Sequence, residues 1–243
     1  MQASNNPVSL LWFDDQVTEL RVLSYNVRGL RDDRAALADV VRSVDPDVVC
    51  VQEAPKYLRW RSKCASLARE WGLLYVAGGG STGGTALFAH LRVDVDDARE
   101  MALSRQFGWP DRGVASALIA KSGARIAVAS IHLPLVAEQR HQHAARVREL
   151  LDTYDTSHRL AAGDLNERPP GPTWEAFGLG GLADLDPQCG PTFPAGQPVK
   201  RIDGILATEG VAVVEHHVLD GPAVARASDH RPLLAVVRVP TDG

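Results

Sequence analysis

The sequence is poor in cysteine and lacks any long apolar run. Its three cysteines, Cys50, Cys64 and Cys189, are odd in number and widely spaced among 243 residues. This excludes a disulfide framework and a Cys-x-x-Cys zinc motif. No apolar run approaches the roughly 20 residues that a membrane-spanning helix needs, and residues 1–6 contain no Lys or Arg that would open a secretory signal. We therefore expect a cytoplasmic protein without stable membrane association.

The chain also lacks a strong excess of charge of either sign. Its formal net charge of −4 argues against a protein that holds nucleic acid by bulk electrostatics alone. A local basic surface is still compatible with this value. The best candidate is the stretch 56–71, an expected helix whose only acid is Glu70. Its basic residues are Lys56, Arg59, Arg61, Lys63 and Arg69. Taken alone, such a stretch is most simply a solvated helix face.

Short apolar runs alternate with a few segments of helical periodicity. The apolar fraction of 45% and the charged fraction of 23% are ordinary for a globular protein. Helices are expected over residues 32–44, 56–71, 137–154 and 172–177. Strands are expected over residues 21–26, 48–51, 73–77, 85–89, 93–103, 114–120, 125–131, 159–162, 201–206, 211–219 and 233–239. The stretch 180–198, rich in Gly and Pro, is expected to form a loop.

The arrangement of these segments predicts one domain. No change in composition marks a linker and the sequence contains no internal repeat, so we expect an α/β catalytic domain over residues 21–240. Residues 1–20 show no clear period and are expected to form an N-terminal extension. Hairpin signals such as Lys121-Ser122-Gly123 argue against a purely parallel sheet. Two packed mixed β-sheets with outer helices fit the pattern, and we expect a monomer.

Two further patterns do not predict ligand sites. Gly78, Gly80 and Gly83 match the dinucleotide-binding pattern G-x-G-x-x-G, but that pattern requires a helix after the glycines. Here an expected strand follows, so a hairpin connection is the better interpretation. His216 and His217 are adjacent in an expected strand, and their side chains therefore point to opposite faces. We expect neither histidine to take part in a metal site.

Polar side chains recur where the apolar runs begin or end. The residues at these positions are Asn26, Glu53, His132, Asp164, Asn166, Asp203, Asp229 and His230. Strand ends that gather at one rim of a sheet form a concave site on rigid supports. Taken singly, the two asparagines read equally well as turn residues, Glu53 as a surface acid and His132 as a rim histidine. The conjunction of the whole set favours a site.

The residue types in this set favour hydrolysis of a phosphate ester with a hard metal ion. Its four acids would repel one another and raise each other's pKa values if they packed together. Mg²⁺ or Mn²⁺ would remove that penalty, because these ions prefer carboxylate and amide oxygens. Zinc suits the set less well, because the His and Cys residues lack ligand spacing. The two histidines can donate hydrogen bonds to an anionic substrate or transfer protons. Acids, a hard metal ion and histidines together suit the attack of water on a phosphate ester.

Six segments that carry these residues resemble the endonuclease/exonuclease/phosphatase superfamily, which has the deoxyribonuclease I-like fold. They are LSYNVRG (23–29), DVVCVQE (47–53), SIHL (130–133), GDLN (163–166), RIDGI (201–205) and SDHRP (228–232). The segments occur in the family's order and span nearly the whole chain. The resemblance implies a four-layer α/β/β/α sandwich with the site at one edge. It also implies a divalent metal, with Glu53 as the principal ligand, Asn26 beside it, and Asp229 holding the same ion or a second one.

The resemblance further implies how the remaining residues act. Asp164 would orient or deprotonate the attacking water, and Asp203 would fix and polarise His230. Asn166 would bind the phosphate, while His132 would contact the phosphate or the leaving group. How general-acid and general-base work divides between Asp164 and His230 is left open by the sequence.

The choice of substrate depends on what this chain lacks relative to the family. It has no obvious room for long DNA-gripping insertions and no membrane segment of the kind that some sphingomyelinases carry. The missing insertions argue against an abasic-site repair role, and the missing membrane segment argues against that kind of sphingomyelinase. The basic stretch 56–71 then favours an endonuclease or general phosphodiesterase acting on DNA or RNA over a lipid phosphatase. Arg112, before an expected strand, is a further candidate for phosphate binding. The alternatives are a lipid or sugar phosphatase, a sphingomyelinase-like phosphodiesterase, and a non-catalytic binding module that retains the site.

Overall fold

A computed structural model describes residues 17–103 and 111–241 and contains two six-stranded β-sheets. The strands of the first sheet are β1 (Val17–Asn26), β2 (Val48–Gln52), β3 (Leu74–Gly78), β4 (Ala86–Ala89), β11 (Ala212–Val218) and β12 (Leu233–Pro240). Their spatial order is β11-β12-β1-β2-β4-β3. Strands from the two ends of the chain therefore lie side by side, with β1 paired to β12 along its length.

The second sheet is built from the middle of the chain. Its strands are β5 (Asp94–Ala102), β6 (Gly113–Lys121), β7 (Ala124–His132), β8 (Arg159–Asp164), β9 (Ala183–Asp184) and β10 (Asp203–Ala207). Their spatial order is β5-β6-β7-β8-β10-β9. Both sheets are mixed, because β1 pairs with β2 and β7 pairs with β8 in parallel while the other pairs are antiparallel.

Each parallel pair is joined by a helix that crosses over one face of its sheet. The helix between β1 and β2 is α1 (Arg34–Ser43), and the helix between β7 and β8 is α3 (Ala137–Leu151). Asp33 caps α1, because its carboxylate accepts hydrogen bonds from the amides of Ala35 and Ala36. Parallel neighbours require such crossovers, and their carboxyl ends then lie at the same edge of the sheet. This arrangement determines where the polar strand ends gather.

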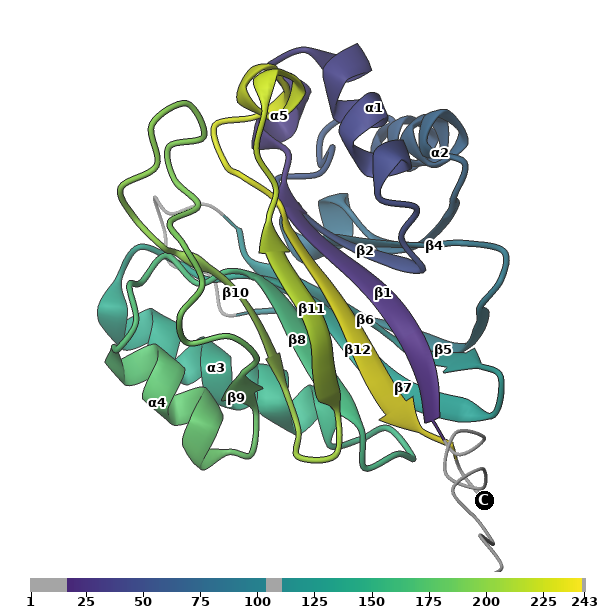
Figure 1. Cartoon of the computed structure of the whole chain (residues 1–243), viewed down its shortest axis with the longest axis vertical. Helices are drawn as coiled ribbons and strands as arrows, with labels where there is room; N and C mark the ends of the chain where they lie inside the picture. The colour runs from purple at the N-terminus through teal and green to yellow at the C-terminus, as the bar shows by residue number, and fades with distance from the viewer. Residues whose placement is uncertain (1–16, 104–110, 242–243) are drawn as a thin grey trace, which may run out of the picture.

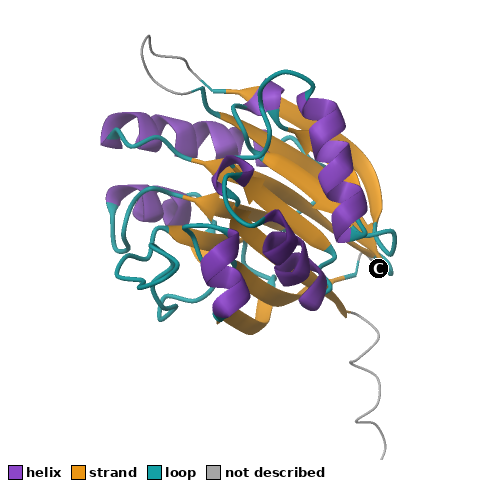
Figure 2. Cartoon of the chain, turned by 90° about the horizontal axis from the view of Figure 1, so that it is seen from above, coloured by secondary structure: helices purple, strands orange, loops and turns teal. Residues whose placement is uncertain are grey.

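The remaining helices complete the outer layers. They are α2 (Trp60–Trp71), α4 (Pro172–Leu179) and α5 (Pro222–Ala227). Figure 1 shows α1, α2 and α5 on one side of the two sheets and α3 and α4 on the other, and Figure 2 shows the layers from above. The predicted four-layer sandwich of two packed mixed sheets with outer helices is therefore confirmed.

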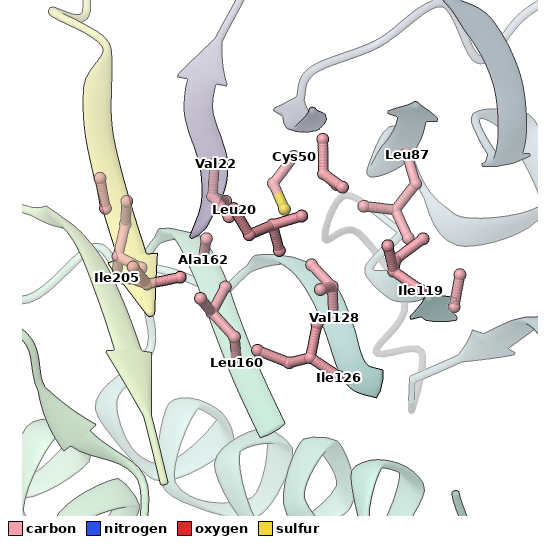
Figure 3. Packing of buried hydrophobic residues seen from close by; sticks show 14 of the residues in the cluster. Leu20, Val22, Cys50, Leu87, Ile119, Ile126, Val128, Leu160, Ala162 and Ile205 are labelled. Carbon is pink, nitrogen blue, oxygen red and sulfur yellow. The ribbon is translucent and has the colours of Figure 1, made fainter. Parts of the chain in front are cut away.

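The core lies mainly between the two sheets. Figure 3 shows Val22 and Cys50 of the first sheet facing Val128 and Leu160 of the second. Short apolar runs such as 48–51 form strands buried on both faces, since one face packs against the other sheet and one against a helix. This explains why those runs are continuously apolar rather than alternating.

Several boundaries differ from the sequence prediction. The first strand begins at Val17 rather than at residue 21, so the last four residues of the predicted extension 1–20 belong to β1. The pattern of apolar residues does not predict these four positions, because Thr18 and Glu19 are polar and are held in a strand by pairing with β12. Residues 1–16 lie outside the described residues. The short helix α5 was not predicted, and β9 lies inside the stretch expected to be a loop.

The glycine-rich segment forms a hairpin connection, as predicted. A three-residue 3₁₀ helix, Gly80–Thr82, leads directly to β4, so no long helix follows the glycines. Gly83 has φ +67°, and a Cβ there would meet the backbone oxygen of Asp111 at 2.3 Å. Glycine is thus required for the close approach of this turn to the chain next to Arg112. Within the described ranges, no helix is both long and apolar enough to cross a membrane.

Candidate active site

Strand register brings three of the predicted residues into one row. His132 at the end of β7 pairs with Asp164 at the end of β8, and Asp164 pairs with Asp203 at the start of β10. Directly paired residues project to the same face of a sheet, so these three side chains converge. Asn26 ends β1, in the other sheet, and reaches the same point. The site therefore lies where the ends of the two sheets meet.

Asp164 is the centre of the cluster and is 2% exposed. Its Oδ2 accepts a hydrogen bond from Nδ2 of Asn26 at 3.3 Å and lies 3.5 Å from Nε2 of His132. Its Oδ1 accepts a hydrogen bond from the amide of Asn166 at 2.8 Å. Burial and the nearby carboxylate of Asp203 raise the pKa of Asp164 above its usual value. A carboxylate in this environment is well suited to accept a proton near neutral pH.

His230 and Asp203 form a buried carboxylate–imidazole couple. Nδ1 of His230 lies 3.0 Å from Oδ2 of Asp203, while its Nε2 points toward Asp164, with 3.8 Å to Oδ2. Burial by itself would lower the pKa of His230. The carboxylates of Asp203 and Asp164 outweigh burial and raise the pKa to about 9. The imidazole is therefore a cation at neutral pH.

His132 has the opposite environment. Its ring is buried, and burial together with the positive charges of Arg112 and His230 lowers its pKa well below the usual value. The site thus contains one cationic and one neutral imidazole on either side of Asp164. Such divergence between neighbouring titratable groups is typical of sites that move protons.

Glu53 follows β2 and faces the same cluster. Nδ2 of Asn26 donates to Oε1 of Glu53 at 3.4 Å as well as to Asp164, so the two carboxylates converge on one point. This donor set fits a hard cation such as Mg²⁺. Glu53 also has φ +54°, a conformation that a non-glycine residue adopts at a cost of about 1–3 kcal/mol. Strain of this kind clusters at functional sites.

Asn26 is oriented by its backbone neighbours. Its Oδ1 accepts a hydrogen bond from the amide of Arg28 at 3.0 Å, which leaves Nδ2 facing the carboxylates. A ligand role for the amide oxygen would require the side-chain amide to turn by about 180°. Asp229, the third predicted metal ligand, lines the same cleft and pairs with Nε of Arg28 at 3.2 Å.

At this end of the sheets, Asp164, Asp203 and His230 form a compact group of two carboxylates and an imidazole. One ligand-type atom from each lies within 4.8 Å of the others. The predicted metal residues Glu53 and Asp229 lie on the cleft wall beside this group. A cation held at the mouth of the cleft would therefore lie next to the Asp164 carboxylate.

Two predicted phosphate-binding residues also line the cleft. Asn166 has φ +52°, a conformation that asparagine tolerates, and its Nδ2 donates to the backbone oxygen of Leu133 at 2.8 Å. Arg112 is half-buried, and its buried Nε has no hydrogen-bond partner among the described residues. Burial lowers the pKa of Arg112, against the opposing effect of Asp164 and Glu53. An anion in the cleft would satisfy this guanidinium.

The cleft has a volume of about 1130 Å³ and a basic rim. The basic residues that line it are Arg31, Arg34, Lys56, Lys63, Arg112, Arg168 and Lys200. The basic stretch 56–71 contributes only partly to this rim, and its helix begins at Trp60 rather than at Lys56. Of its basic residues, Lys56 and Lys63 line the cleft, whereas Arg61 stacks on Trp60.

Sequence reasoning missed two side chains that contact the catalytic candidates. The hydroxyl of Thr192 donates to Oδ2 of Asp203 at 2.5 Å and is fully buried. The ring of Phe193 lies 4.9 Å from that of His230, centroid to centroid. Both belong to a loop with no periodic pattern, so no signal in the sequence singled them out. Arg28 lies in the matching segment LSYNVRG, and its contact is visible only in the structure, where its guanidinium pairs with Asp229.

Comparisons with known proteins agree on the family. The model of the Endonuclease/Exonuclease/phosphatase family matches residues 23–230 of this chain. No curated protein sequence matches it. A solved endonuclease/exonuclease/phosphatase family protein from Bacteroides thetaiotaomicron is similar, with a TM-score of 0.78 and 20% identity, over 92% of this chain and 99% of that chain.

Two further solved structures have names that indicate distinct proteins on this fold. Mannosyl-6-phosphatase Bt3783 from Bacteroides thetaiotaomicron VPI-5482 has a TM-score of 0.75 and 20% identity, with 90% of this chain and 99% of that chain covered. Humanized TDP2 from D. rerio has a TM-score of 0.66 and 19% identity, with 90% and 98% covered. At these identities the likeness shows a shared fold.

Proposed function

Because this chain belongs to the endonuclease/exonuclease/phosphatase family, whose members are hydrolases acting on phosphate esters, we propose that it is a Mg²⁺- or Mn²⁺-dependent phosphodiesterase that cleaves nucleic acid. The observation that carries the proposal is the buried row His132–Asp164–Asp203 with His230 at its side, set in a cleft with a basic rim.

Glu53 and Asp229 would hold the metal, and Asn26 would join them once its side-chain amide turned to present Oδ1. The convergence of the Glu53 and Asp164 carboxylates on Asn26 supports this assignment, because such a set favours a cation with oxygen ligands. When bound, the metal would polarise a phosphate oxygen as a Lewis acid. Arg28, paired with Asp229, would hold that carboxylate toward the cleft.

Asp164 and His230 would divide the proton transfers. The raised pKa of Asp164 suits a general base that takes a proton from the attacking water. The raised pKa of His230 keeps a proton on the ring, so that its Nε2 can stabilise negative charge at the phosphorus or protonate the leaving oxygen. Asp203 holds the ring through Nδ1 and thereby sets its orientation.

The phosphate group would bind to neutral and cationic donors around Asp164. Neutral His132 and the Arg112 guanidinium both face the cleft, and Asn166 lies beside them. The rim beyond them would hold neighbouring phosphates of a chain, which is the reason for preferring a nucleic acid to a small ester. A sugar phosphatase is the second candidate, favoured by the structural likeness to a mannosyl-6-phosphatase.

The test is a substrate panel with the metal varied. The full chain is incubated with Mg²⁺ or Mn²⁺ and with DNA, RNA, bis-p-nitrophenyl phosphate, sugar phosphates or phospholipids. We expect cleavage of nucleic acid that chelation abolishes. Asp164→Asn should lower kcat by about 10²–10⁴-fold, since general-base catalysis contributes that much, with the melting temperature measured as a control for folding.

Three outcomes would contradict parts of the proposal. Activity that survives both Asp164→Asn and His230→Gln excludes the mechanism. Turnover of sugar phosphates without cleavage of nucleic acid favours the phosphatase. Absence of turnover on every substrate favours a binding module that retains the site.

A further inference from the structure

A second cluster of metal-ligating side chains lies outside the active site. Asp186 and Cys189 follow the short strand β9, and His216 lies on β11, the edge strand of the other sheet. One ligand-type atom from each residue lies within 4.8 Å of the others. Nδ1 of His216 is 3.3 Å from Oδ2 of Asp186. The cluster therefore joins the edges of the two sheets.

The imidazole of His216 is buried and poorly partnered. Its side chain is only 5% exposed, and in the described part of the chain neither ring nitrogen has a hydrogen bond of acceptable geometry; the Asp186 carboxylate lies 3.3 Å from Nδ1. Buried polar groups are almost always paired, because leaving one unpaired costs about 1–3 kcal/mol. A buried imidazole beside a carboxylate and a thiol, without a hydrogen bond, indicates a ligand that bonds to nitrogen.

Asp186 and Cys189 make their other hydrogen bonds within their own loop, so one ligand atom of each faces His216. Oδ1 of Asp186 accepts the amide of Gln188 at 3.0 Å, which leaves Oδ2 directed at His216. Within the described ranges, the one hydrogen bond of the Cys189 thiol is a long contact, 3.7 Å to the backbone oxygen of Gly190. Arg201 is the cation that lowers the pKa of Cys189. Its guanidinium is already paired with Asp184 through two hydrogen bonds of 2.7 Å.

We propose that Asp186, Cys189 and His216 bind a zinc-type transition-metal ion. One sulfur, one nitrogen and one oxygen donor suit Zn²⁺, whereas Mg²⁺ and Ca²⁺ take oxygen donors. Three protein ligands leave a fourth tetrahedral position for water or a further donor. This site differs from the oxygen-rich cleft in the ions that it selects.

Binding requires the thiol to lose its proton. Burial raises the pKa of Cys189 to about 11, and Asp186 acts in the same direction against the opposing charge of Arg201. The free thiol is therefore neutral at pH 7, and uptake of the metal releases a proton. Zinc binding should accordingly strengthen as the pH rises.

The ion would fix a loop that reaches the active site. Two residues, Gly190 and Pro191, separate Cys189 from the neighbouring pair Thr192 and Phe193, which contact Asp203 and His230. A metal bonded to this loop and to β11 would close the edge between the sheets and hold that wall of the cleft. The role is structural, so the readout is binding and stability rather than turnover.

The experiment uses the full chain freed of metal with a chelator. Zn²⁺ is titrated calorimetrically in excess Mg²⁺, which occupies the oxygen-rich site, and Co²⁺ is used as an optical probe. We expect one equivalent of Zn²⁺ per chain, a rise in melting temperature of about 5–10 °C at a hundredfold excess over Kd, and a thiolate-to-cobalt charge-transfer band. The same stoichiometry is expected in Glu53→Gln.

Matched variants assign the ligands. Cys189→Ser should abolish the cobalt–sulfur band, and both it and His216→Ala should weaken Zn²⁺ binding by more than about tenfold. His217→Ala is the control, because His217 is the adjacent residue of β11, is exposed and pairs with Glu215. It should bind as the unaltered chain does.

The proposal fails if Glu53→Gln abolishes all Zn²⁺ binding, since the ion would then lie in the oxygen-rich cleft. It fails as well if the unaltered chain binds no Zn²⁺, or if Co²⁺ gives no sulfur band. It also fails if Cys189→Ser binds Zn²⁺ as tightly as the unaltered chain. Circular dichroism shows whether each variant is folded. If a variant is not, the cobalt spectrum of the unaltered chain decides the question.

Discussion

At the level of single residues, the surroundings of Asp164, His132 and His230 distinguish groups that would titrate alike in water. Burial with a neighbouring acid raises the pKa of Asp164, and a paired carboxylate raises that of His230. Burial, together with the positive charges of Arg112 and His230, lowers the pKa of His132 and leaves its ring neutral. One carboxylate and two imidazoles thus have three different proton affinities within a few ångströms.

Thr192 provides a test at this scale. Its hydroxyl donates to the Asp203 carboxylate that holds His230, so Thr192→Val removes one hydrogen bond to a charged group with little change in volume. Such bonds contribute about 1.5–3 kcal/mol, and we expect kcat to fall by about tenfold or more while KM changes little. Steady-state kinetics on bis-p-nitrophenyl phosphate with Mg²⁺ measures both constants.

Thr192→Ser is the matched control for that substitution. It keeps the hydroxyl and should retain most of the activity, whereas a purely structural role would make the loss follow side-chain volume. Equal kcat values for the valine variant and the unaltered chain would remove Thr192 from the positioning of Asp203.

At the level of elements, parallel pairing and register place the site. The crossovers α1 and α3 return the chain so that β1 and β2, and β7 and β8, end at the same edge. The other end of β2 is fixed by Asp47, which is fully buried. Asp47 accepts a hydrogen bond from the amide of Arg21 at 2.7 Å and binds Lys121 at 2.9 Å and the side chain of Arg92. One carboxylate thus ties β1, β6 and the chain before β5 to β2.

Asp47→Asn tests this anchor through stability. Burial opposes ionisation, but the Arg21 amide, Arg92 and Lys121 outweigh it and hold the pKa of Asp47 below its usual value. The anchor therefore stabilises the fold above the unfolded-state pKa of about 3.9, and that contribution is lost as pH falls through the lower folded-state pKa. We expect a loss of about 2–4 kcal/mol in the free energy of unfolding at pH 7.

Urea unfolding at several pH values measures this prediction. The difference between Asp47→Asn and the unaltered chain should be largest near neutral pH and should shrink below about pH 4. A difference that stays constant across this range would mean that the ionised carboxylate does not contribute, and that only the shape of the side chain matters.

At the level of the whole molecule, a negative net charge coexists with a basic rim at the cleft. The chain carries a formal charge of −4, yet cationic side chains from several elements gather around the mouth of the site. Binding of a polyanion would therefore depend on this local surface. The exposed side chain of Tyr57 lies on the same rim and offers an apolar face to a bound chain.

The double variant Lys56→Ser, Lys63→Ser tests the rim. We expect kcat/KM on DNA to fall and its logarithmic dependence on salt concentration to flatten by about 1–2, because each phosphate contact contributes about 0.9 to the slope. Turnover of bis-p-nitrophenyl phosphate should not change. Cleavage assays at several salt concentrations give the slope.

A control with the same change of charge is available in the same region. Arg59→Ser, Arg69→Ser removes two positive charges from residues that do not line the cleft. It should leave the slope close to that of the unaltered chain. If both double variants reduce the slope equally, net charge rather than the rim governs binding. If neither does, the preference for nucleic acid is wrong.

The sequence by itself determined the fold class and the candidate residues of the site. Continuous apolar runs predicted buried strands, and helical periodicity predicted the crossovers α1 and α3, because burial in a layered domain imposes these patterns on neighbouring residues. Polar residues at the ends of those runs, such as Glu53 and Asp164, stood out against this background. Their assigned roles stay proposals, but the structure brings them to one cleft.

Only the tertiary structure decided which distant side chains meet. Thr192 contacts Asp203, and His216 approaches Cys189, through strand register and the packing of one sheet edge against the other. The side chains of His216 and His217 point to opposite faces of their strand, so the two cannot share a metal. That local argument says nothing about ligands for His216 from another segment. Likewise, α2 turns only part of its basic stretch toward the cleft. Local pattern records whether a residue is buried, whereas the identity of its neighbour depends on contacts across the chain that no short stretch encodes.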